Sequence, residues 1–178
     1  MKVITTILIL SLSLSTLSIP TPPTKRSVTD YTTLFADLTT SINDLTTTIT
    51  LYTSSSIPAT TLQDSATTIL AAFTSALNTL YALPLLTAAE TLAIINPLID
   101  TRDAADSMID SLIAAQPYIV ADGLEAWIAD FLHDLGELAG WVRDETAYNA
   151  VEAYAGTVYS ILDDVCADVG RGLAEFTV

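Results

Sequence analysis

The chain has little of what most enzymes use for chemistry. Among its 178 residues there is one histidine, His133, and one cysteine, Cys166. His133 and Glu137 are four residues apart and can share a metal on one helix face, but a solvated face is the simpler interpretation. A lone cysteine forms no intrachain disulfide, so Cys166 is either a buried, inert thiol or a site of intermolecular pairing. We therefore predict a protein that is not an enzyme, with no catalytic residue, cofactor or metal.

Positive charge is also scarce, since six Lys and Arg residues face 21 acidic residues and the formal net charge is −15. Half of the cations lie in residues 1–26, whereas every acidic residue follows position 26. The three later cations are Arg102, Arg143 and Arg171. So acidic a chain is not expected to bind nucleic acid, which needs a cationic face, or anionic lipid headgroups.

The first residues have the three parts of an export signal. Lys2 is followed by an apolar run over residues 3–17, with the small residues Thr16 and Ser18 before Ile19. The run is too short for a membrane anchor, so residues 1–18 are predicted to be a signal peptide. Residues 19–26 are proline-rich and end in Lys25-Arg26. We interpret them as a propeptide cut by a dibasic protease, the alternative being a basic end to the leader. A secreted domain, extracellular or in a cell wall, then covers residues 27–178.

From position 28 onward, apolar residues recur three and four apart, which is typical of amphipathic helices. The stripes cover residues 28–52, 62–80, 87–113, 124–142 and 151–173. Thr87 with Glu90 is a capping-box pattern that opens the third helix, and Pro117 is predicted to end it. Sustained alternation of the strand type is absent. The sequence therefore predicts an all-α fold, a single antiparallel bundle of about five long amphipathic helices.

The stripes contain many alanines and few large aromatics, so the bundle can leave an apolar cavity between its helices. The predicted lining residues are Phe35, Leu38, Ile69, Phe73, Ile99, Phe131 and Val158. Arg102 extends the stripe of the third helix, and at one end of a cavity it would suit a carboxylate headgroup. The alternative is that Arg102 reaches the rim or pairs with Asp103 or Asp106.

Several segments resemble the fungal hydrophobic surface binding protein A family, which includes cell wall galactomannoproteins. The likeness lies in residues 28–52, residues 62–80 and the run Leu85-Leu86-Thr87-Ala88-Ala89-Glu90. It implies a secreted five-helix bundle that adsorbs to hydrophobic solid surfaces or holds a fatty acid or other lipid in its core. Some members are described as recruiting hydrolases, so the resemblance also implies a secreted hydrolase as a partner. It brings no catalytic residues.

The sequence also favours a second function, of another class. Serine and threonine make up 17 of the 35 residues from 27 to 61. In a secreted protein, hydroxyl groups so crowded can carry O-linked sugars. The alternative to a lipid or surface binder is therefore a structural, O-glycosylated cell-wall mannoprotein or antigen without a ligand.

Overall fold

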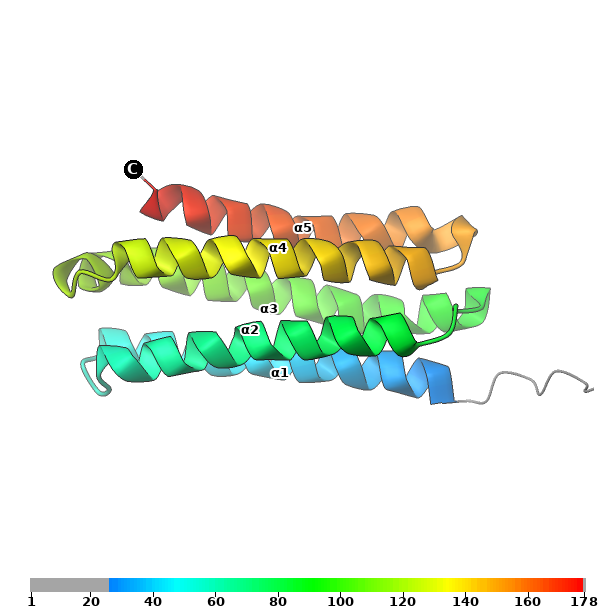
Figure 1. Cartoon of the computed structure of the whole chain (residues 1–178), viewed down its shortest axis with the longest axis horizontal. Coiled ribbons are helices and arrows are strands. Elements are labelled where there is room, and N and C mark those ends of the chain that lie inside the picture. The colour runs from blue at the N-terminus through cyan, green and yellow to red at the C-terminus, as the bar shows by residue number, and fades with distance from the viewer. Residues whose placement is uncertain (1–25, 178) are drawn as a thin grey trace, which may run out of the picture.

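The computed structural model describes residues 26–177, which form five helices and no strands. They are α1 (Arg26–Thr53), α2 (Ala59–Ala82), α3 (Ala88–Ala121), α4 (Glu125–Asn149) and α5 (Glu152–Phe176). Each helix runs antiparallel to the one before it (Figure 1), so the predicted all-α antiparallel bundle is confirmed. The predicted signal peptide, 1–18, lies outside the described residues. So does the predicted propeptide, 19–26, except Arg26, the first residue of α1.

None of the described helices combines the length and the apolar character that crossing a membrane requires.

The helices pack side by side as a closed ring. In order around the ring, α1 contacts α2, α2 contacts α4, α4 contacts α5, α5 contacts α3, and α3 returns to α1. Only α3 and α4 touch across the ring, and they do so slightly. Within the described residues, α5 therefore packs against neither α1 nor α2. In Figure 1, α1 and α2 lie along one side of the bundle, α5 lies along the other, and α3 and α4 lie between them.

The apolar stripes face inward and form one continuous core. In α1, the predicted stripe from Tyr31 to Tyr52 is buried at every position. Threonine is a mediocre helix former, so α1 is held by this packing more than by its own propensity. Several outward threonines donate their hydroxyl hydrogen to the carbonyl four residues earlier, as Thr40 does to Ala36 and Thr47 to Asn43. These bonds satisfy the hydroxyls without a partner helix.

One end of the bundle is tied by hydrogen bonds between segments distant in sequence. Thr87 and Glu90 form the predicted capping box at the start of α3. The Leu86 N–H donates to the Asn149 carbonyl at 2.7 Å, and the Asn149 Nδ2 donates to the Leu80 carbonyl at 3.2 Å. The α2–α3 loop is thereby fixed against the end of α4.

The prediction that Pro117 ends the third helix is wrong. Helix α3 continues through it to Ala121, and Pro97 also lies inside the helix. Pro117 is exposed. On the solvent side water can bond the carbonyl that loses its N–H partner, so a proline there is tolerated better than one facing the core.

Candidate functional site

The predicted cavity residues do not gather around one space. Phe35, Leu38, Ile69, Phe73, Phe131 and Val158 are buried in the core, and Ile99 is half-buried against it. They are spread along the bundle, however. Phe131 lies in the second turn of α4, and Val158 lies in the second turn of α5, which starts at the opposite end. At 1.5 Å per residue these two positions are about 18 Å apart along the bundle axis.

Arg102 lies on the outer surface and pairs with Asp103, as in the alternative interpretation from the sequence, and not at the end of an internal cavity. Its guanidinium bonds the Asp103 carboxylate at 2.7 Å, lies 3.9 Å from Asp164 of α5, and its side chain is 33% exposed. Thr101 takes the core position instead, with 2% exposure, and its hydroxyl bonds the Pro97 carbonyl at 2.9 Å. A charge at that position would be costly to bury, whereas the bonded hydroxyl is not.

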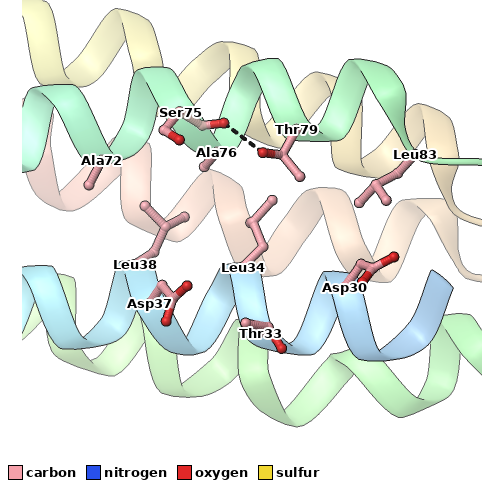
Figure 2. Close-up of a pocket in the computed structure, with 10 residues that line it drawn as sticks. All are labelled: Asp30, Thr33, Leu34, Asp37, Leu38, Ala72, Ser75, Ala76, Thr79 and Leu83. Carbon is pink, nitrogen blue, oxygen red and sulfur yellow. Dashed lines mark hydrogen bonds between the residues drawn. The ribbon is translucent and has the colours of Figure 1, made fainter. Parts of the chain in front are cut away.

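The clearest hollow is a groove between α1 and α2, with a volume of about 530 Å³ (Figure 2). Leu34, Leu38 and Ala76 form its apolar floor, and each is less than a tenth exposed. The remaining lining residues are Asp30, Thr33, Asp37, Ala72, Ser75, Thr79 and Leu83. Its volume falls in the range of small-molecule sites, roughly 300 to 1,000 Å³.

Small side chains on α2 create this groove. Ala72, Ser75, Ala76 and Thr79 have the i, i+3, i+4, i+7 spacing of one helix face. Opposite the leucines of α1, they fill less space than larger side chains would (Figure 2). Of the residues predicted for the site, only Leu38 lines the groove. The sequence signal for the groove is this row of small residues on α2. The predicted site consisted mainly of large apolar side chains and therefore did not include them.

The groove has an acidic rim. Asp30 and Asp37 stand on α1 at its edge, and both are exposed (Figure 2). Among the ion pairs of the described residues, none involves either carboxylate. A ligand in the groove therefore meets apolar carbon below and negative charge beside it.

Arg102, Arg143 and Arg171 lie on α3, α4 and α5, and each is engaged with aspartates. Arg171 of α5 bonds Asp110 at 2.6 Å and Asp106 at 2.7 Å, both on α3. Arg143 of α4 bonds Asp163 of α5 at 2.7 Å. These contacts, with those of Arg102, hold the three guanidinium groups on the side of the bundle away from the groove.

The remaining candidate groups form no described site. His133 and Glu137 are 3.8 Å apart, and both side chains are more than half exposed. In residues 26–177 no three metal-ligating side chains come together. Cys166 is half-buried, and burial raises the pKa of its thiol above the usual value. A raised pKa lowers the thiolate fraction at neutral pH, which makes the sulfur less reactive.

Four exposed apolar side chains belong to segments at the end of the bundle where α2 ends and α3 begins. This apolar end surface consists of Tyr81, Leu85, Leu92 and Tyr148, which are 63%, 64%, 52% and 73% exposed. Residues 65–99 contain one charged residue, Glu90, whereas Tyr148 lies in sequence between Asp144 and Glu145 on one side and Glu152 on the other. The Glu90 carboxylate is engaged in the capping box.

Together, these features define a small five-helix bundle with an apolar surface groove. The model of the family described as hydrophobic surface binding protein A matches residues 28–140, and the chain belongs to this family. The family resemblance seen in the sequence is thereby confirmed. No curated protein matches the chain in sequence.

Solved structures show the same fold. Ligand-binding domain 1 of the Penicillium marneffei MP1 protein, complexed with arachidonic acids, has a TM-score of 0.81 at 19% identity, covering 86% of this chain and 100% of that one. Domain 2 of the same protein, complexed with multiple arachidonic acids, has a TM-score of 0.80 at 19% identity, covering 86% and 98%. Afmp4p in complex with palmitic acid has a TM-score of 0.79 at 19% identity, covering 84% and 99%.

Proposed function

We propose that this protein is a lipid-binding protein that takes a long-chain apolar ligand between α1 and α2. The observation that carries the proposal is the groove with its floor of Leu34, Leu38 and Ala76. The family name and the fatty acids bound in the similar structures support the class of ligand. Each methylene that the groove removes from water contributes about 0.8 kcal/mol, so a ten-carbon chain can be held without a strong polar contact.

The interface between α1 and α2 has few polar contacts, so the two helices can separate to admit a ligand. Helix α2 packs only against α1 and α4, and Asp64 is its one charged residue. The side-chain hydrogen bond described between α1 and α2 joins Thr48 to Ser65 at 3.2 Å, near the loop that connects the helices. At the groove, the contact between α1 and α2 is made by apolar side chains. Opening it there would admit an alkyl chain toward the core residues Phe35 and Phe73.

Filling the groove should abolish binding. Ala72 lines the groove and is half-buried, so Ala72→Trp places a large side chain in the space that the ligand needs. We expect delipidated protein to form a one-to-one complex with decanol or decanoate in native mass spectrometry, and Ala72→Trp to bind at least about tenfold more weakly.

Ala153→Trp is the matched control, because Ala153 is exposed on α5, away from the groove. It should bind like the unaltered protein. If the unaltered protein bound neither decanol nor decanoate, the proposed function would be wrong. Unchanged binding by Ala72→Trp would place the ligand elsewhere.

We also propose that the protein is secreted after two cuts, one after Ser18 and one after Arg26, leaving a domain of residues 27–178. The export-signal pattern and the dibasic pair support this. The N-terminal residue of protein recovered from the culture medium tests it. Ser27 is expected, whereas Ile19 would refute the second cut.

A second candidate function is adsorption to hydrophobic solids, favoured by the four exposed apolar side chains of the apolar end surface. Exposed aromatic and aliphatic side chains gathered on one face are typical of interaction sites. The two functions use different parts of the molecule, since neither Tyr81 nor Leu85 lines the groove. Recruitment of a secreted hydrolase to such a solid stays a prediction of the family resemblance.

A further inference from the structure

We propose that the α1–α2 groove selects long-chain ligands whose head donates a hydrogen bond and carries no negative charge, so that it prefers long-chain alcohols to free fatty acids. The inference rests on the proposed lipid-binding function and names the ligand class of the same groove. It places the selectivity in Asp30 and Asp37.

The rim of the groove carries two carboxylates and no described cation. Asp30 and Asp37 lie seven residues apart on α1, on either side of Leu34, and both line the groove (Figure 2). An ionised carboxylate only accepts hydrogen bonds. The hydroxyl of a long-chain alcohol can donate to it. A fatty-acid carboxylate in the same place has no hydrogen to donate and is repelled.

The three arginines on α3, α4 and α5 do not offset that repulsion, and Arg26, at the start of α1, is absent from the proposed mature domain, residues 27–178. Arg102, Arg143 and Arg171 are bonded to aspartates on α3, α4 and α5. Helix α5, which carries one aspartate partner of each of these arginines, contacts neither α1 nor α2. An electrostatic interaction between exposed charges on opposite sides of the bundle is largely screened at physiological ionic strength.

One hydroxyl at the rim is already engaged. The Thr79 hydroxyl donates to the Ser75 carbonyl at 2.9 Å, the bond drawn as a dashed line in Figure 2. Its hydrogen is therefore directed into its own helix. The Asp30 and Asp37 carboxylates at the rim only accept hydrogen bonds, whereas the hydroxyls of Thr33 and Ser75 can also donate, so the selectivity depends on the two carboxylates.

The test compares decanol and decanoate binding at pH 7 by isothermal titration calorimetry, on the full domain. A neutral alcohol also leaves water more readily than a carboxylate, so tighter alcohol binding alone is insufficient. The informative quantity is the ratio of the two dissociation constants. In the double variant Asp30→Asn with Asp37→Asn, we expect this preference for decanol to fall roughly tenfold, mainly because decanoate binds more tightly.

Asp44→Asn is the matched control. Asp44 is exposed on α1, seven residues beyond Asp37, and does not line the groove, so its removal should leave the ratio unchanged. Raising the salt concentration should also narrow the preference in the unaltered protein, because salt screens exposed charges. A long-chain amine is a poor probe, because the excess of acidic residues would attract it over the whole surface.

The two proposals fail in different ways. If the double variant kept the ratio of the unaltered protein, or if decanoate bound more tightly than decanol, the selectivity inference would be overturned while lipid binding stood. If neither ligand bound, the proposed function itself would fail, and this inference with it.

Discussion

Replacing Phe35 with alanine should lower the free energy of unfolding by about 3 to 5 kcal/mol. Phe35 lies on α1 with 0% exposure, in the continuous core. Removing the ring forfeits its burial and leaves a cavity, because close-packed neighbours relax only partly. Urea denaturation followed by circular dichroism measures the change. Domains of this size have about 5 to 15 kcal/mol in all, so the variant is expected to fold with a much lower midpoint.

Leu51→Ala is the matched control on the same helix. Leu51 is 43% exposed, so its truncation should cost under about 1 kcal/mol. A cost for Phe35→Ala no larger than that of the control would contradict a close-packed core at this position.

The same variant also reports on how deep a ligand reaches. If an alkyl chain enters between α1 and α2 toward the core, the cavity in Phe35→Ala gives it more room. Saturating decanol should then recover part of the lost stability, about 2.7 kcal/mol at a hundredfold excess over the dissociation constant. Stabilisation by decanol that is no larger in Phe35→Ala than in the unaltered protein would instead confine the ligand to the surface groove.

The helices could be predicted because their signals are local. The stripe of α1 from Tyr31 to Tyr52 follows from spacing alone, and all of it is buried. The start of α3 follows from Thr87 and Glu90, because a capping box needs only neighbours in sequence. The prediction that Pro117 ends the helix fails because the effect of a proline depends on which side of the helix it faces, and that is a tertiary property.

The site was predicted less well, for a physical reason. The core face of α3 includes small or polar residues, among them Thr101 and Ala105, which are 2% and 1% exposed. The spacing of the large apolar residues therefore predicted a core face that includes Ile99 and extends to Arg102, which is the face next to the buried one. The groove forms because α2 packs beside α1. The order of the helices around the ring is a tertiary property, so the groove could not be predicted from neighbouring residues in the sequence.

The apolar end surface should govern adsorption to hydrophobic solids. A variant with Tyr81→Gln, Leu85→Ser, Leu92→Gln and Tyr148→Gln removes its four large apolar side chains, all more than half exposed, without touching the core. Burying such side chains contributes about 1.5 to 3 kcal/mol each when complete. Even partial contact at four positions predicts at least about a tenfold loss of affinity. Depletion of the protein from solution by polystyrene beads is the measurement.

The opposite end of the bundle supplies the control. Leu51, Tyr118 and Val120 are exposed there by 43%, 48% and 48%, and changing all three to Gln should leave adsorption nearly intact. Equal losses in both variants would mean that the bundle adsorbs without regard to orientation. Because the contact with the solid is made by apolar side chains, adsorption should not weaken as salt is raised, whereas the decanol preference of the groove should narrow. The opposite responses to salt would separate a surface contact from a ligand held between α1 and α2 in the same protein.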